Sequence, residues 1–419
     1  MPQLLRVGVS QSHTLSSLAD TLAALKETTQ RAAQNDISIL LFPEAYLGGY
    51  PRTCNFGAAV GARTTWGRDQ FLAYTKGAVD LGDTPLGAGD DWIERKLSVN
   101  KETGRRGDGT REFLEDVARE TGVFIVTGVI EKAGGSLYCA ALYVDPKRGV
   151  IGKRRKVMPT ASERLVWAQG SPSTLKAVAT TIKGIRVVLG CAICWENFMP
   201  LLRYSLYSQG VNLWLAPTAD ARDSWEPLMR TIAGEGRCFV LSTNQCIKKK
   251  NLPTWITGDP KEWLAKQSNT TSKTAKPEES LTNGTSSEQP SNFGRRLSIT
   301  RTEENHSIAW RNKDDSPAAI AEEQDTEDKP TSLSESKHPP PASEVDSEEY
   351  VSRGGACIVD PMGNTLVGPV WEKENELLWT EVDFDDCERG HLDFDVTGHY
   401  SRPDAFRLSV EGLELVPPP

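Results

Sequence analysis

The 419-residue sequence lacks the features that mark membrane and secreted proteins. No stretch approaches the roughly 18 to 20 apolar residues that a membrane-spanning helix requires. The first residues, MPQLLRVGVSQS, contain no charged leader, no long apolar core and no cleavage site of small residues, so we expect no signal peptide. These absences predict a cytoplasmic protein that has no membrane partner.

An excess of positive charge is also missing. The formal net charge is -9 and the isoelectric point is near 5.3, so the chain offers no basic surface for nucleic acid. We expect no nucleic-acid partner. A small neutral or weakly polar substrate fits this charge balance better.

Histidine and paired cysteine are scarce as well. Only five histidines occur, and the eight cysteines are spread from Cys54 to Cys387 without a secretory signal. Most of the cysteines are therefore expected to be reduced core residues rather than disulfide partners.

Composition divides the chain into three parts. Apolar strand-like runs alternate with amphipathic segments up to about residue 245, which is typical of an α/β fold. Residues 261–349 are rich in Ser, Thr, Glu, Pro and Asn and predict a low-complexity, disordered insertion. Within it, the sequence RRLS ending at Ser298 fits either a basophilic kinase site or a solvated linker. Residues 1–260 and 350–419 together are predicted to form one domain.

Two polar side chains follow predicted buried strands. The apolar run from Ile37 to Phe42 is stopped by Pro43, and Glu44 comes next. A second apolar run, residues 185–189, leads to Cys194. Functional groups of open α/β sheets gather where strands end, so we expect Glu44 and Cys194 to meet.

The segment GCAICWEN places Cys191 three residues before Cys194. A structural zinc site needs a second ligand pair, and the sequence has none at similar spacing. A thioredoxin-like redox pair usually has a turn-forming residue between its sulfurs, whereas this pair encloses Ala192 and Ile193. The remaining interpretations are an inert core thiol, favoured for Cys191, and a nucleophile that emerges from the core, favoured for Cys194.

A nucleophilic thiol needs a base or a nearby cation, and a carboxylate with a lysine can supply both. The run Lys153 to Lys156 contains a candidate lysine. On composition alone, this run is a solvated basic loop or a nuclear-targeting patch. The apolar, turn-forming sequence MPTASERLVW that follows is unusual for a charged surface.

Three motifs resemble the signatures of the nitrilase superfamily. They are FPEAYLGGYPR at residues 42–52, KVMPTASERLVW at residues 156–167 and CWENFMPLLR at residues 194–203. The tail FDVTGHYSRPDAF, residues 394–406, resembles the ending of nitrilases proper. The resemblance implies a four-layer α-β-β-α sandwich of the carbon-nitrogen hydrolase type and a homo-oligomer built from dimers.

The resemblance also implies roles for single residues. Cys194 is the nucleophile, Glu44 the general base and Lys156 the cation, while Glu163 positions the substrate or the lysine. The backbone N–H of Trp195 stabilises developing charge, and Tyr50 and Trp167 either line the pocket or pack in the core. No metal and no organic cofactor is implied.

The activity that the resemblance implies is hydrolysis of a nitrile to a carboxylic acid and ammonia, through a thioimidate and an acyl-thioester. A cyanide hydratase or an amidase of the same superfamily is the alternative, and a non-catalytic binding scaffold is a second one. Two features depart from the family pattern: Arg154 stands where many nitrilases have His, and the insertion separates two strands that most relatives join quickly.

Overall fold

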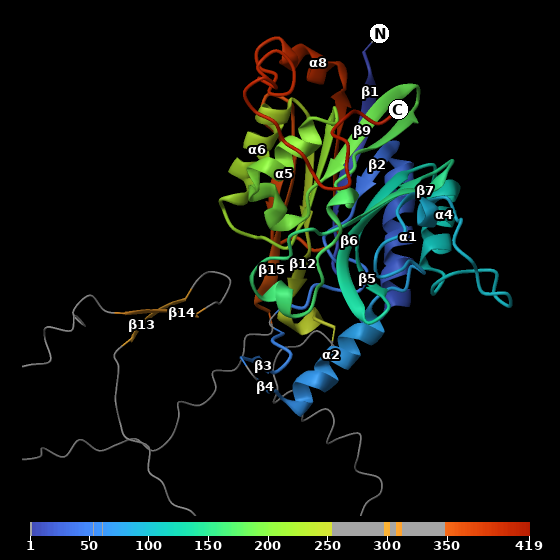
Figure 1. Ribbon diagram of the computed structural model, residues 1–419, viewed down its shortest axis with the longest axis vertical. Helices are drawn as coiled ribbons and strands as arrows, with labels where there is room; N and C mark the ends of the chain where they lie inside the picture. The colour runs from blue at the N-terminus through green and yellow to red at the C-terminus, as the bar shows by residue number, and fades with distance from the viewer. Residues whose placement is uncertain (1, 53, 61, 254–296, 302–306, 312–347) are drawn as a thin grey trace, which may run out of the picture. The chain divides into compact units, whose positions relative to one another are not determined.

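A computed structural model describes residues 2–52, 54–60, 62–253, 297–301, 307–311 and 348–419 (Figure 1). The chain divides into two compact units, residues 1–269 with 346–419 and residues 270–345. In the second unit, β13 (Leu297–Arg301) pairs antiparallel with β14 (Ser307–Arg311). Apart from this pair and residues 348–349, the predicted disordered insertion of residues 261–349 lies outside the described residues.

The first unit contains a six-stranded sheet in the order β17-β1-β2-β5-β6-β7. Its central pairs, β1 with β2 and β2 with β5, are parallel, and the outer pairs are antiparallel. The strands are β1 (Leu4–Gln11), β2 (Ile37–Leu41), β5 (Phe124–Ala133), β6 (Ser136–Asp145), β7 (Gly149–Arg155) and β17 (Glu376–Asp383).

A second sheet has the order β12-β15-β11-β10-β9-β8, with β16 paired to β15. Strands β9, β10 and β11 are parallel, and β15 returns antiparallel beside β11 and β12. The strands are β8 (Val178–Ile182), β9 (Ile185–Cys191), β10 (Leu213–Thr218), β11 (Phe239–Asn244), β12 (Cys246–Lys248), β15 (Tyr350–Val359) and β16 (Thr365–Trp371).

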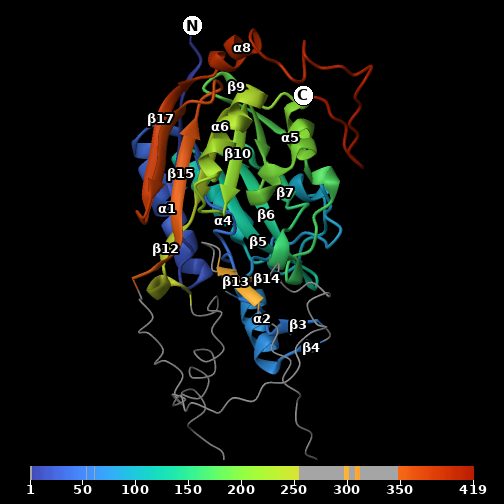
Figure 2. The same cartoon turned by 90° about the vertical axis from the view of Figure 1, so that its left-hand side faces the viewer.

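Helices cover the outer face of each sheet in the first unit. Helices α1 (Leu18–Gln34) and α4 (Thr110–Thr121) pack on the first sheet, and α5 (Pro200–Tyr207) and α6 (Trp225–Gly236) pack on the second (Figure 1, Figure 2). Each of these four helices contributes buried residues to the core beside its sheet. The predicted four-layer α-β-β-α sandwich is confirmed.

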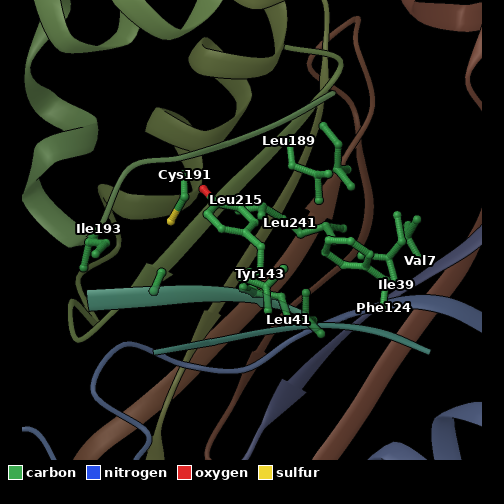
Figure 3. Close-up of a cluster of buried hydrophobic side chains, with 14 of the residues drawn as sticks. Val7, Ile39, Leu41, Phe124, Tyr143, Leu189, Cys191, Ile193, Leu215 and Leu241 are labelled. Carbon is green, nitrogen blue, oxygen red and sulfur yellow. The ribbon is translucent and has the colours of Figure 1, made fainter. Parts of the chain in front are cut away.

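Alternate side chains along a strand point to opposite faces of its sheet, and this explains how the layers pack together. On β10, Leu213 and Leu215 enter the core between the sheets, while Trp214 and Ala216 enter the core beneath α5 and α6. Figure 3 shows the central core, in which side chains of the two sheets face each other. Burial on both faces accounts for the continuous apolar runs in the sequence.

The remaining elements are short or peripheral. They are β3 (Ala58–Ala59), β4 (Ala62–Arg63), α2 (Thr65–Gly77), α3 (Asp90–Ile93), α8 (Asp385–His391) and the 3₁₀ turns η1 (Ala161–Leu165), η2 (Pro172–Thr174), η3 (Cys194–Phe198) and η4 (Lys249–Asn251). Within the described ranges, no helix combines the length and the apolar character needed to span a bilayer.

Candidate active site

Glu44 lies in a buried loop just after β2. The residue is 1% exposed, and Gln245 Nε2 donates to its main-chain oxygen at 3.1 Å. The loop presses against β5 so closely that a Cβ on Gly128 would lie 2.2 Å from the Pro43 oxygen, so only glycine fits there. The carboxylate is thus held at the end of the strand, as the sequence predicted.

Cys194 begins η3, shortly after β9 ends. Its φ of 55° is in the left-handed region, and this turn directs the chain away from the strand. Thr218 Oγ1 donates to Cys194 Sγ at 3.3 Å, and Asn197 Nδ2 donates to the main-chain oxygens of Ala192 and Cys194, both at 2.7 Å. Cys194 leaves its strand but is only 4% exposed. The expectation that it emerges from the core was therefore wrong, because its side chain packs within the central core.

Lys156 follows β7 directly and brings the carboxylates together. Its Nζ lies 2.8 Å from Glu44 Oε1 and 3.0 and 2.8 Å from the two Glu163 oxygens. The side chain is 0% exposed. Glu44 Oε2, in contrast, is buried and accepts no hydrogen bond from any described residue.

Burial sets the protonation states of the site. It raises the pKa of Glu44 above its ordinary value, although Lys156 opposes it. Burial and the charge of Glu44 raise the pKa of Cys194 well above that of a free thiol, with Lys156 again opposing. For Lys156, burial favours the neutral amine, but Glu44, Cys194 and Glu163 raise its pKa well above the ordinary value. These directions favour the protonated thiol and the charged ammonium group, so a base must take the thiol proton before the sulfur can act as a nucleophile.

Glu163 and two aromatic residues surround Lys156. Tyr50 Oη donates to Glu163 Oε1 at 2.9 Å, and the Trp167 ring contacts Tyr50 edge-on at 5.4 Å between centroids. Trp167 Nε1 donates to Tyr74 Oη at 3.0 Å, and Lys156 Nζ lies 5.5 Å from the Trp167 ring centre. The structure thus brings Tyr50, Trp167 and Glu163 to the predicted site.

The Trp195 side chain points elsewhere. Its Nε1 donates to Asp220 Oδ2 at 2.9 Å, and the Arg222 guanidinium stacks 4.4 Å from its ring centre. Only the backbone of Trp195, which directly follows Cys194 in the chain, is left for the role that the resemblance implies.

Glu196 was not identified from the sequence. Its carboxylate accepts hydrogen bonds from the backbone N–H groups of Ile193, Val157 and Met158, and it lies 2.6 Å from Arg154 Nη1. Glu196 therefore ties the loop after Lys156 to the loop that carries Cys194. The carboxylate two residues after Cys194 was the available signal, and its ion pair with Arg154 balances the charge of this buried arginine.

The basic run is not a solvated surface. Lys153 Nζ lies 2.5 Å from Asp83 and 2.6 Å from Glu131, and Arg155 Nε lies 2.7 Å from Glu131. All four cations of residues 153–156 are buried with carboxylate partners. The alternative of an exposed basic loop or targeting patch was wrong, because paired carboxylates balance these charges.

The two alternatives for the cysteine pair also find no support. All eight cysteines are free thiols, and Cys191 lies in the central core (Figure 3). In the part of the chain that the structure describes, no group of three or more His, Cys, Asp or Glu side chains is arranged to hold a metal ion.

A pocket opens beside the site. Its volume is about 20 Å³, room for roughly one water-sized group in the conformation described. Tyr50 belongs both to this pocket and to the Glu163 cluster, and Ala219 in its wall follows Thr218, the partner of the sulfur. The lining residues are Thr14, Tyr50, Arg52, Ala219, Asn244, Gln245, Ile247, Leu252, Pro253 and Ser352.

Comparison with known proteins gives consistent results. The family described as "Carbon-nitrogen hydrolase" matches residues 6–391. An arylacetonitrilase of Trametes versicolor is 32% identical over 98% of each chain. An aliphatic nitrilase of Sinorhizobium fredii is 34% identical over 94% of this chain and 90% of the relative.

Solved structures share the fold at low sequence identity. A carbon-nitrogen hydrolase from Helicobacter pylori superposes with a TM-score of 0.52 at 12% identity, covering 93% of each chain. A carbon-nitrogen hydrolase superfamily protein from Xanthomonas campestris has the same TM-score of 0.52 at 12% identity, covering 97% of this chain and 100% of the other. At this identity, the likeness concerns the fold alone.

Proposed function

Because this chain belongs to the carbon-nitrogen hydrolase family, we propose that it hydrolyses an organic nitrile to a carboxylic acid and ammonia. The names of its relatives, an arylacetonitrilase and an aliphatic nitrilase, support nitriles as the substrate class. The observation that carries the proposal is the buried cluster of Glu44, Lys156 and Cys194, in which Lys156 pairs with Glu44 at 2.8 Å and both charges act on the Cys194 thiol.

The first half of the proposed reaction uses these groups in turn. Glu44 accepts the thiol proton as Cys194 Sγ attacks the nitrile carbon, and it then passes this proton to the nitrile nitrogen, which gives a thioimidate and leaves Glu44 as a carboxylate again. The Lys156 ammonium and the Trp195 backbone N–H stabilise the charge that develops on the substrate. Glu163 holds the lysine through two hydrogen bonds.

Two water molecules complete the reaction. The first adds to the thioimidate carbon, and the tetrahedral intermediate expels ammonia to leave an acyl-thioester. The second hydrolyses the thioester, which releases the acid and restores the thiol. Glu44 serves as the base that removes a proton from each water. Tyr50 and Trp167 form the wall beside Lys156.

The test measures ammonia release and the ratio of acid to amide from aliphatic, aromatic and arylacetonitriles and from cyanide. We expect acid and ammonia from wild type and none from Cys194→Ala. Amide as the only product, or turnover of cyanide alone, would favour a hydratase, and turnover of amides alone an amidase. A Cys194→Ala variant as active as wild type would contradict the proposal, and inactivity of wild type on every compound would favour the binding scaffold.

We also propose a cytoplasmic homo-oligomer built from dimers, in which residues 1–260 and 350–419 form one domain. The C-terminal tail supports association, because Leu392 is 86% exposed and Phe406 is 81% exposed. Light scattering of the full chain and of Phe406→Ser tests this proposal. We expect a mass above that of one chain, and a smaller mass for the variant.

A further inference from the structure

Arg52 differs from the other cations near the active site. Its Nη2 donates to the Ala219 main-chain oxygen, and its Cζ lies 5.2 Å from the Tyr50 ring centre. Lys153, Arg155 and Lys156 each have a carboxylate partner within 3 Å. No carboxylate of the described residues pairs with Arg52, although its residue is partly buried.

Most other polar groups in the pocket wall are already hydrogen-bonded to their neighbours. Gln245 Oε1 accepts from the Thr14 backbone N–H at 3.0 Å, and its Nε2 donates to Glu44. Asn244 Nδ2 donates to Asp220 and Gly354 oxygens at 3.1 and 3.0 Å. Ser352 Oγ donates to the Gln245 oxygen at 2.6 Å. Among these lining side chains, Arg52 keeps the most donors, because a guanidinium has five N–H groups and its Nη2 donates to Ala219.

From this contrast we propose that Arg52 binds a carboxylate at the far end of the substrate, so that the preferred substrate is a cyano-carboxylate. The inference rests on the proposed nitrile hydrolysis. A guanidinium fork matches a carboxylate in geometry and charge, and partial burial strengthens the pairing. The nitrile itself is neutral, which suits the other end of the site, where Glu44 and Glu163 outnumber Lys156.

The pocket wall connects the two ends. Tyr50 contacts Arg52 through its ring and Glu163 through its hydroxyl, and Ala219 joins Arg52 to Thr218 beside the sulfur. Ile247 and Leu252 supply apolar surface for the methylene groups between nitrile and carboxylate. A substrate of this kind is bound at both ends, which orients the nitrile carbon toward Cys194.

A matched pair of substrates tests the inference. Cyanobutanoate and pentanenitrile have the same chain, except that a carboxylate in one replaces a methyl group in the other. In Arg52→Gln we expect the ratio of their kcat/KM values to fall about tenfold to a hundredfold, because a charged hydrogen-bond partner is lost. Arg52→Lys keeps the charge but not the fork, and its ratio should lie between those of Arg52→Gln and wild type. Arg119→Gln, which removes an exposed guanidinium paired with Asp116, should keep the wild-type ratio.

Binding to the inactive protein separates this inference from the proposed function. Calorimetry compares cyanobutanoate binding to Cys194→Ala with binding to the double variant Cys194→Ala/Arg52→Gln. Binding that weakens at least tenfold in the double variant would support Arg52 as the anion site, even if wild type turned over neither nitrile. Equal affinities, or an unchanged kcat/KM ratio in Arg52→Gln, would overturn the inference.

Discussion

Two buried ion clusters lie at the end of the same strand, β7, and differ in charge balance. The balanced cluster joins Lys153 and Arg155 to Asp83 and Glu131, two cations to two carboxylates. The active-site cluster joins Lys156 alone to Glu44 and Glu163. A balanced set satisfies itself and stabilises structure, whereas a surplus carboxylate with a free oxygen can take up a proton. Within residues 153–156, Lys153 and Arg155 therefore belong to a balanced cluster that stabilises the fold, whereas Lys156 belongs to the unbalanced cluster of the proposed active site.

The largest expected effect comes from Glu44→Gln. Without a base for the thiol proton, kcat should fall about 10²- to 10⁴-fold. Stability should hold or rise, because a neutral amide replaces a buried carboxylate whose pKa burial has raised. Ammonia release and chemical denaturation measure the two quantities. A kcat close to that of wild type would contradict the role of Glu44.

Glu131→Gln should lower stability strongly and activity less. It leaves Lys153 and Arg155 buried with one carboxylate fewer, which should lower the free energy of unfolding by about 3–5 kcal/mol. The kcat of the folded protein should fall less than in Glu44→Gln, since Glu131 lies outside the active-site cluster. Denaturation curves measure the loss of stability, and activity per folded molecule measures the change in kcat. Loss of activity at unchanged stability would erase the distinction between the clusters.

The two clusters should also respond to pH in opposite directions. Burial alone would raise the pKa of Asp83, but Lys153 and backbone donors outweigh it, and the pKa is lowered. Asp83 thus adds stability above its ordinary pKa and loses it as pH falls through the folded value. The deficit of Asp83→Asn should shrink as pH falls through that range.

For Glu44, whose pKa is raised, the sign reverses. Its carboxylate opposes folding at neutral pH, and protonation removes this cost as pH falls through the raised pKa toward the ordinary value. Any stability advantage of Glu44→Gln should therefore be present at neutral pH and vanish in acid. Chemical denaturation between neutral and acid pH measures the free energy of unfolding of Asp83→Asn and Glu44→Gln relative to wild type. If both differences changed in the same direction with pH, the predicted contrast between the clusters would be wrong.

Cys191→Ala should have the smallest effect. Its sulfur is buried in the central core, where burial raises the pKa of the thiol to about 12. The hydrogen bonds described above for Lys156 and Cys194 go to other groups than this thiol. We expect kcat within about twofold of wild type and a stability loss near 1 kcal/mol. Ammonia release and denaturation check this, and a loss comparable to that of Cys194→Ala would place Cys191 in the chemistry.

Strand ends and motifs predicted most of the site. Glu44 and Cys194 follow buried strands, and that pattern alone predicts their meeting. Lys156 and Glu163 came from the resemblance, because a basic run looks the same whether it is exposed or paired. Thr218 also stands at a strand end, β10, and the same rule would have found it. The Arg52 environment depends on contacts between distant loops, which no local pattern encodes.

The fold was predictable to a similar degree. Apolar runs and the resemblance predicted the sheets and the four layers. They did not predict that β17 lies antiparallel beside β1, with Leu4 opposite Asp383, because register depends on pairing across nearly the whole chain.

At Cys194, the left-handed backbone conformation favours glycine, whereas the proposed function requires a side chain that carries a thiol. Glycine adopts a φ of 55° at no steric cost, whereas a side chain there costs about 1 kcal/mol or more. Cys194→Gly would relieve this backbone strain but remove the sulfur on which the proposed hydrolysis depends. Selection for stability alone would therefore favour glycine at this position, whereas the proposed hydrolysis requires the sulfur.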